Sequence, residues 1–385
     1  MTTVLFSRCR VFDGHAAEPR EPLDVLIEGG RITEVSERPI RTAAARVVAV
    51  NGRTLMPGLI DAHWHAVAAD VNLTRLDAMP ESLRSAHTRI YLEEALNRGF
   101  TTIRDAGGAD FGLALAVEQG LIKGPRIFFG GRALSQTGGH GDMRPLQHVD
   151  PGCQCGALAQ LADGPTEVRK AIREELRKGA HQIKLMVSGG VASPADPIWM
   201  LQYGEEEIRA AVDETARRRT YVMAHAHTAD ATRRCVEYGV RSVEHGTLID
   251  RETAEFVASR GAFVVPTLVV IMTLWEHGAA LGFPPVSMGK LAEVKDAAIG
   301  ALDLLRAAGV KVGFGTDLLG SLHGYQSREF LLRAEVLSPY EILKSSTSVN
   351  AELLNRPGEL GVVAAGAIAD LLVVEGDPLK DLGLL

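Results

Sequence analysis

Two histidines separated by one residue, His63 and His65, form a pair that could bind a metal ion. They end an apolar run that follows Pro57 and Gly58, as a short β-strand would. Side chains alternate along a strand, so both imidazoles point to the same face. Neutral imidazole nitrogens at this spacing can bind one metal ion, although an isolated pair also arises by chance. The pair therefore predicts a metal site only if further ligands end other strands.

Three more candidate ligands stand at the ends of other apolar runs. His225 closes the run 221–225, His245 closes 242–245, and Asp317 follows a glycine-rich strand end, where an aspartate is more often a turn or helix cap. His227 repeats the spacing of the first pair. We assign His225 to the metal and His227 to the substrate. The two roles could be exchanged, because strand boundaries predicted from sequence shift by a few residues.

Lys184 is the most unusual residue among the candidates. Alternation within 182–186 places Gln182 and Lys184 on the face opposite Ile183 and Leu185, which we expect to be the interior of the fold. Burial disfavours an ammonium group and can lower its pKa by roughly 3–5 units. A neutral amine can react with carbon dioxide to give a carbamate, whose two oxygens can bridge two cations. A lysine extending to solvent is the alternative. Beside four histidines and an aspartate, we favour the carbamate.

The elements that must position these residues alternate between strand and helix. Eight strands are predicted at 59–65, 101–105, 126–129, 182–186, 221–225, 242–245, 263–265 and 311–315. Helices are predicted at 167–178, 205–218, 229–238, 251–259 and 291–308. This order predicts an α/β fold, a (β/α)8 TIM barrel whose active site gathers at the carboxyl ends of the strands. No glycine-rich phosphate motif follows a strand, which argues against a doubly wound nucleotide-binding sheet. Long connections at 130–165 and 266–290 are expected to be functional loops.

The two ends of the chain have a different character. Short β-branched runs at 4–6, 24–28, 32–35 and 47–50 are separated by turns, with a hairpin at Gly29 and Gly30, and a further run covers 369–375. No helix separates the runs near the amino terminus. We predict that residues 1–57 and 355–385 form a small β-sandwich domain, and that residues 58–354 form the TIM barrel.

Composition narrows the class of protein. The chain has 385 residues, 46% of them hydrophobic, and a net charge of −7, so neither a nucleic acid nor an anionic membrane is an expected partner. Its four cysteines are too few for a disulfide scaffold, and Cys153 and Cys155 are interpreted as loop thiols. The start lacks the layout of a signal peptide, and no apolar run reaches the roughly 18 residues that span a bilayer. We expect a cytoplasmic protein.

Together these residues resemble the amidohydrolase superfamily. The segment Met56-Pro-Gly-Leu-Ile-Asp-Ala-His-Trp-His65 is similar to its opening motif, and Ser242-Val-Glu-His-Gly246 and Gly315-Thr-Asp317 are similar to later ones. The resemblance covers nearly the whole chain. Three further segments (138–142, 183–190 and 322–326) make the chain look most like the prolidase-like and Xaa-Arg/Lys dipeptidase branch, which is related to imidazolonepropionases.

The resemblance implies a binuclear site, usually zinc. One ion would be bound by His63, His65 and Asp317, the other by His225 and His245, with carboxylated Lys184 as the bridge. A hydroxide bridging two such ions would attack the substrate amide. Asp317 would also take up and deliver the proton. His140, for which a plain loop histidine is the alternative, would steady the oxyanion.

The resemblance also suggests residues that contact the substrate, namely His140, His227, His323, Tyr325 and Gln326. The last three could instead cap the helix that follows. Relatives often carry tyrosine where His227 stands, so the substrate range stays open. We expect a small-molecule substrate, an Xaa-Pro or similar dipeptide or an N-acyl amino acid, and a homo-oligomeric assembly.

Three alternative functions remain. The first is a hydrolase of a non-peptide amide, carbamate or ester, such as a mycotoxin or xenobiotic. The second is a mononuclear deaminase or cyclic-amide hydrolase. Deaminases of the superfamily have a glutamate where Thr228 stands and lack the bridging lysine, which argues against this one. The third is a non-catalytic scaffold, although such proteins usually lose the metal ligands that are retained here.

Overall fold

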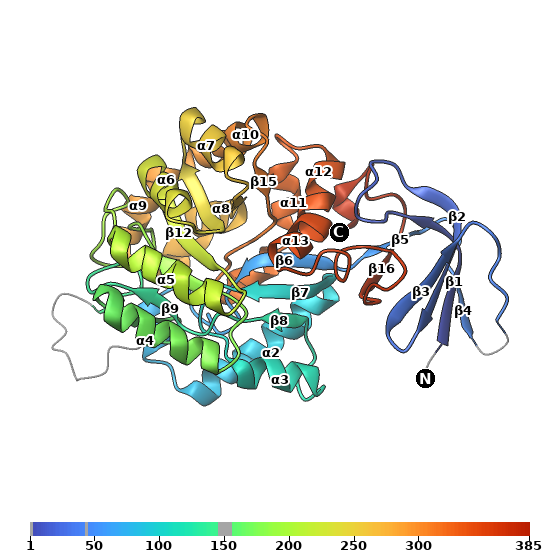
Figure 1. Ribbon diagram of the computed structural model, residues 1–385, viewed down its shortest axis with the longest axis horizontal. Helices are drawn as coiled ribbons and strands as arrows, with labels where there is room; N and C mark the ends of the chain where they lie inside the picture. The colour runs from blue at the N-terminus through green and yellow to red at the C-terminus, as the bar shows by residue number, and fades with distance from the viewer. Residues whose placement is uncertain (1–2, 43–44, 145–155) are drawn as a thin grey trace.

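Parallel strands and helices alternate through the main body of the protein (Figure 1). The computed structural model describes residues 3–42, 45–144 and 156–385, so Cys153 and Cys155 lie outside the described residues. Each of the eight runs predicted as strands overlaps an observed strand. They are β6 (Leu59–Trp64), β7 (Phe100–Asp105), β8 (Arg126–Phe128), β11 (Ile183–Met186), β12 (Val222–Thr228), β13 (Ser242–Leu248), β14 (Phe263–Val265) and β15 (Lys311–Val312).

These strands belong to two parallel sheets. One has the order β6-β7-β8, and the other has the order β10-β9-β11-β12-β13-β14-β15, with β9 (Ala133–Ser135) and β10 (Ala159–Leu161) at one edge. Backbone hydrogen bonds connect the two sheets on both sides. The Ala62 amide donates to the Phe314 carbonyl at 2.8 Å, and the His181 amide donates to the Phe129 carbonyl at 2.8 Å. The carboxyl end of β6 is thereby held next to the segment that carries Asp317.

Apolar packing sets which face of each central strand is turned toward the helices. Leu185 and Val243 are fully buried, in one core with Ile208 of α5 (Glu205–Arg217) and Leu302 of α10 (Ala298–Ala307). Because side chains alternate along a strand, the residues beside them point the other way, away from the helices. This arrangement directs Lys184 and its neighbours on other strands toward a common interior.

The helices agree with the predicted ones in part. Predicted helices correspond to α4 (Gly164–Arg177), α5 (Glu205–Arg217), α6 (Ala229–Glu237) and α7 (Arg251–Ser259). Further helices are α1 (Leu73–Asp77), α2 (Glu81–Asn97), α3 (Phe111–Glu118), α11 (Arg328–Arg333), α12 (Pro339–Lys344), α13 (Asn350–Leu353) and the short helices η1 (Gly320–Tyr325), η2 (Ser345–Val349) and η3 (Leu382–Leu384). None of the described helices has both the length and the apolar run that crossing a bilayer requires.

Two predictions about the region 266–308 are wrong. The supposed loop 266–290 contains α8 (Leu268–Leu281), whose first turns are apolar on all sides and buried, so it lacks the periodicity that reveals a surface helix. Gly282, with a φ of 88°, ends it. The supposed helix 291–308 is two helices, α9 (Pro285–Lys295) and α10 (Ala298–Ala307).

Strands from both ends of the chain share one sheet, at one end of the molecule (Figure 1). Its order is β16-β5-β1-β2-β3, with β4 also paired to β1. The bounds are β1 (Thr3–Val11), β2 (Arg20–Glu28), β3 (Arg31–Ser36), β4 (Arg46–Ala49), β5 (Thr54–Pro57) and β16 (Leu371–Val374). Gly29 and Gly30 have φ of 58° and 80° and form the expected hairpin turn. The association of the two ends in one sheet agrees with the prediction from sequence.

Candidate metal centre and active site

A single cavity contains every residue predicted to bind metal. The six predicted ligands that line it are His63, His65, Lys184, His225, His245 and Asp317. His140 and His227, the two histidines expected to contact the substrate, line it as well. The rest of its wall is mainly apolar. The cavity therefore combines a concentrated group of potential ligands with a hydrophobic surround, as small-molecule sites do.

Lys184 occupies the inner face of β11, as alternation along that strand requires. It is 2% exposed, and it lines the cavity together with Met186, two residues further along. Burial lowers the pKa of the Lys184 amine to about 8, although Glu244 and Asp317 act in the opposite direction. About a tenth of the amine is therefore neutral at pH 7, far more than for an ordinary lysine.

His245 reaches the cavity through an irregularity in β13. Glu244 and His245 are consecutive, so regular alternation would point them to opposite faces. His245 instead has a φ of 75°, Gly246 follows with 60°, and the register between β12 and β13 shifts just beyond His245. Such a bulge re-aims a side chain. Asp317 also has a left-handed backbone, with a φ of 55°. Non-glycine residues in this region cost roughly 1–3 kcal/mol each and cluster at functional sites.

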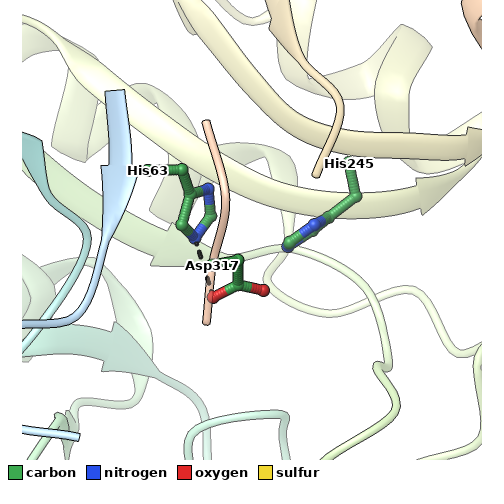
Figure 2. Close-up of side chains that lie close together, drawn as sticks. All are labelled: His63, His245 and Asp317. Atoms are coloured by element: carbon green, nitrogen blue, oxygen red, sulfur yellow. Dashed lines mark ion pairs between the residues drawn. The ribbon is translucent and has the colours of Figure 1, made fainter. Parts of the chain in front are cut away.

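Three of these side chains form a compact group (Figure 2). The ligand atoms of His63, His245 and Asp317 lie within 4.8 Å of one another. Oδ1 of Asp317 is 3.3 Å from Nε2 of His63 and 3.1 Å from Nε2 of His65. A cation that pulled these atoms inward by a few tenths of an ångström would meet nitrogen and oxygen ligands at usual distances.

The hydrogen bonds of the histidine rings suit a metal site. In each of four rings, one nitrogen forms a hydrogen bond with a protein group other than Asp317. The second nitrogen of His63 and of His65 faces Asp317. The bonded pairs are His63 Nδ1 with Glu244 Oε2 (2.8 Å), His65 Nδ1 with the Gly107 carbonyl (3.1 Å), His225 Nε2 with the Gly189 carbonyl (3.2 Å) and His245 Nδ1 with Thr267 Oγ1 (2.8 Å). Outer partners of this kind orient metal-binding histidines, so the donor set fits divalent cations.

Electrostatics favour the metal-binding forms of His225, His245 and Asp317. For His65, burial would lower the pKa, but Asp317 and Asp105 outweigh it and the pKa is raised. Burial, together with neighbouring histidines, keeps the pKa of His225 and of His245 well below the usual value, so both rings are neutral. Burial alone would raise the pKa of Asp317, but the adjacent His63 and His65 outweigh it and hold that pKa well below its ordinary range. Neutral imidazoles and an ionised carboxylate are the species that bind a cation.

A buried ion pair beneath His63 was missed in the sequence. Arg104 and Glu244 are both fully buried, and Nη2 of Arg104 donates to both carboxylate oxygens of Glu244, at 2.9 and 3.0 Å. Burial would raise the pKa of Glu244, yet Arg104 outweighs it and the pKa is about 2. Arg104 sits in a largely buried strand, Phe100–Asp105, where a charged side chain is as unexpected as Lys184 is in β11. Applying that rule to β7 would have found it.

His140 and His227 both lie at the cavity, as expected for substrate contacts. The His140 ring stacks on His225 with 4.1 Å between centroids, and its Nδ1 is 2.8 Å from Ser193 Oγ. The His227 ring stacks on His245 at 4.9 Å. Since His225 and His227 both line the cavity, their roles remain exchangeable.

The prediction that His323, Tyr325 and Gln326 line the pocket is wrong, because none of them is among the cavity-lining residues. His323 packs between two aromatic rings, 4.5 Å from Trp64 and 4.8 Å from Tyr91. The other two point elsewhere: Tyr325 is 39% exposed and stacks on His277, and Gln326 donates to Asp61 at 2.9 Å. The segment winds as a 3-10 helix, so successive side chains leave in different directions.

Comparison with known proteins agrees with this site. The sequence model of the amidohydrolase family matches residues 54–384, so the chain belongs to that family. It is 33% identical to ochratoxinase from Aspergillus niger over 345 residues, which cover 85% of this chain and 71% of that protein.

Two solved structures resemble the whole chain. The crystal structure of a prolidase complexed with N-methylphosphonate-L-proline has a TM-score of 0.98 and 50% identity, and the match covers 100% of this chain and 95% of that one. The structure of a Xaa-Pro dipeptidase with bound methionine has a TM-score of 0.91 and 27% identity, covering 100% and 96%. The predicted relationship to prolidases and dipeptidases is confirmed. The protein is a hydrolase of carbon–nitrogen bonds from a metal-dependent family, and it contains a candidate metal-binding site.

Proposed function

We propose that the protein is a binuclear, zinc-dependent amidohydrolase that cleaves the amide bond of a dipeptide, such as Xaa-Pro, or of an N-acyl amino acid. The observation that carries the proposal is the convergence of six potential ligands from five strand ends on one cavity with a largely apolar wall. The similarity to a prolidase complexed with a proline phosphonate supports the same substrate class.

We also propose the architecture that the family resemblance implies. Residues 58–354 would form one (β/α)8 barrel, supported by the backbone hydrogen bonds that join the two parallel sheets on both sides. Residues 1–57 and 355–385 would form the small β-sandwich, supported by the pairing of β5 with β16.

The proposed metal ligands divide into two sets that share a bridge. His63, His65 and Asp317 would bind one cation, and His225 and His245 the other. Lys184 would bridge them as a carbamate: its neutral amine adds to the carbon of carbon dioxide and releases one proton. The pKa of about 8 for Lys184 supports this reaction. When bound, the two cations would supply Lewis acidity and lower the pKa of water.

The remaining steps belong to the side chains of the chain itself. Asp317, whose carboxylate is ionised, would accept a proton from the attacking water and deliver it to the leaving amine. His140 would donate a hydrogen bond to the oxygen of the scissile carbonyl as negative charge develops there. His227, stacked beside His245, would contact the substrate.

The side chains that line the cavity influence which substrates it can bind. Hydrophobic side chains from several elements would contact it and exclude water, among them Leu73, Met143, Val191, Val270, Ile271 and Leu291. Lys184 is the only lysine or arginine among the lining residues, all of which belong to the described part of the chain. The hydrophobic lining favours substrate groups that pack on apolar surface.

A second candidate function is hydrolysis of a non-peptide amide. It is favoured by the 33% identity to ochratoxinase together with the same apolar wall. Deamination has less support, because Thr228 stands where a deaminase would have its glutamate. The Thr228 hydroxyl accepts from the Ala231 amide at 3.3 Å and caps α6.

A substrate screen of the zinc-loaded protein tests the proposal. We expect an Xaa-Pro dipeptide or an N-acyl amino acid to be hydrolysed with kcat/KM of at least about 10⁴ M−1 s−1, the lower bound for ordinary enzymes. Amino-acid release is measured alongside ammonia release, with Asp317→Asn protein purified identically as the control for contaminants. Hydrolysis restricted to ochratoxin-like amides would support the second candidate, and ammonia release without amide cleavage would contradict both.

A further inference from the structure

A buried polar network behind His140 lies outside the groups proposed so far. It includes Ser193 and Asp196, from the segment between β11 and α5, and Lys290, from α9. Ser193 and Asp196 are at most 1% exposed, and Lys290 is 7% exposed. Burying a carboxylate and an ammonium is costly unless both are paired and hydrogen-bonded. The cost of burying these groups suggests that the network has a role at the adjacent His140.

The hydroxyl of Ser193 fixes the direction of the hydrogen bonds. Ser193 Oγ donates its single proton to Oδ1 of Asp196, because an ionised carboxylate only accepts. Burial would raise the pKa of Asp196, but the hydrogen bond from His140 and other contacts outweigh it and the pKa is about 2. Ser193 Oγ can then only accept from Nδ1 of His140, 2.8 Å away. Nδ1 of His140 thus carries a proton, and Nε2 is the ring nitrogen left for the cavity.

Asp196 also faces the His140 ring directly. Its Oδ2 is 3.4 Å from Nδ1 of His140, and it accepts from the Gly190 amide and from Nε2 of Gln202, both at 3.1 Å. The Asp196 carboxylate therefore contacts the Nδ1 side of the ring both directly and through Ser193 Oγ.

Lys290 fixes the segment that carries the carboxylate. Its Nζ donates to the carbonyls of Ser193 and Asp196, each at 2.8 Å, and is 3.6 Å from Oδ1 of Asp196. One ammonium therefore holds both residues that act on His140 and balances the buried negative charge.

Contacts on the other sides leave the ring little freedom. The His140 amide donates to Oε1 of Gln202 at 2.9 Å, and one ring face stacks on His225. Gly190 borders the ring so closely that a Cβ there would lie 2.3 Å from Cε1 of His140. A side chain at position 190 would displace the ring, so glycine is required by this close approach.

From this geometry we infer that Asp196 is a positioning residue for His140, acting with Ser193 and anchored by Lys290, and that it orients Nε2 of His140 toward the scissile carbonyl. The inference rests on the proposed role of His140. It assigns to a buried carboxylate the orienting part that a third residue plays in catalytic triads.

A double-mutant cycle on the zinc-loaded enzyme tests this inference. We expect His140→Ala to lower kcat by about 10²–10³-fold, the range for an oxyanion donor. Asp196→Asn should lower kcat by about 10–100-fold, as loss of an orienting partner does, with little change in KM and unchanged metal content. In the His140→Ala background, Asp196→Asn should have no further effect. Multiplicative losses in the double variant would overturn the inference.

The matched control is Asp163→Asn. Asp163 is exposed and tethers the same loop, accepting from the Thr137 amide at 2.9 Å, without contact to His140. We expect its kcat to stay within about twofold of native, as for other exposed substitutions. A loss equal to that of Asp196→Asn would indicate general loop damage and overturn the inference. If Asp196→Asn does not fold, Ser193→Ala interrupts the same link and replaces it in the cycle.

Nitrogen NMR of histidine-labelled enzyme gives a readout besides activity. The signal of His140, assigned by its absence in His140→Ala, should show a protonated Nδ1 in the native enzyme and a changed environment in Asp196→Asn. An unprotonated Nδ1 would overturn the inference. Native kcat in His140→Ala would instead remove the proposed oxyanion role itself, so the two failures can be told apart.

Discussion

The strand ends and the turn at 320–326 both place histidines near Asp317, in opposite chemical settings. His63 at the end of β6 has Nδ1 bonded to Glu244 and Nε2 facing Asp317. His323 is fully buried between Trp64 and Tyr91, and neither of its ring nitrogens has a hydrogen-bond partner. Burial and Arg98 lower its pKa to about 3, so it is a neutral part of an aromatic cluster.

The difference shows that residue type near a site does not by itself define a ligand. Parallel strands direct polar side chains from several elements to one interior, where each ring can be held by an outer partner. A helical turn spreads its side chains around an axis, so a neighbour in sequence can be remote from the chemistry. Variants at the two regions should therefore differ greatly in effect.

The largest effect is expected for Lys184→Ala. Without the carbamate neither cation keeps its bridge, so metal and activity should be lost together. We expect kcat to fall by at least about 10³-fold, since Lewis-acid activation is worth several kcal/mol. Steady-state kinetics and elemental analysis of the same sample provide the check. Two-metal occupancy retained in the variant would refute the bridging role.

Asp317→Asn separates proton transfer from metal binding. The amide keeps an oxygen ligand but cannot accept the proton from water. We expect much of the metal to stay bound while kcat falls by about 10²–10⁴-fold, the range for general acid–base catalysis. Near-native kcat in a metal-loaded sample would count against Asp317 as the base.

Glu244→Gln tests whether the hydrogen bond from Nδ1 of His63 to Glu244 orients the His63 ring for metal binding. The variant keeps the shape but removes the negative charge that accepts from Nδ1 of His63 and pairs with buried Arg104. We expect metal affinity to fall by about 10–100-fold, as for other outer partners of metal-binding histidines. Competition with a zinc chelator measures this affinity. An unchanged affinity would show that strand geometry alone orients His63.

Tyr325→Phe should have the smallest effect. The Tyr325 ring stacks on His277 at the surface and the side chain does not line the cavity. We expect kcat/KM to stay within about twofold of native, the range for exposed positions. His227→Gln, on a ring that does line the cavity, provides the contrast and should lower kcat/KM more. A larger loss in Tyr325→Phe than in His227→Gln would reverse the comparison between the two regions.

Strand alternation explains why so much of the candidate site could be predicted from sequence. A buried strand tolerates a charged side chain only on the face that lines the interior site. Lys184, within an apolar run, could therefore be predicted to point into that site. The same argument applies to Arg104, which was overlooked because it does not bind metal or substrate. The eight central strands were predictable because most of them are short runs of apolar and β-branched residues between helical segments.

Other features depend on contacts that no local pattern encodes. The inward orientation of His245 comes from a bulge and a φ of 75° rather than from alternation. Helix α8 was missed because its buried first turns are apolar all round. The network that joins His140 to Asp196 and Lys290 brings together three segments up to about 150 residues apart in the chain, so only the folded structure reveals it.

Metal content tests the central claim most directly. Protein purified without chelator and analysed by inductively coupled plasma mass spectrometry should contain about two divalent ions per chain, as expected from the number of potential ligands at the site. The ions should be removed by a chelator together with activity, and zinc should restore both. One ion or none in a folded, active sample would contradict a binuclear centre built on His63, His65, Lys184, His225, His245 and Asp317.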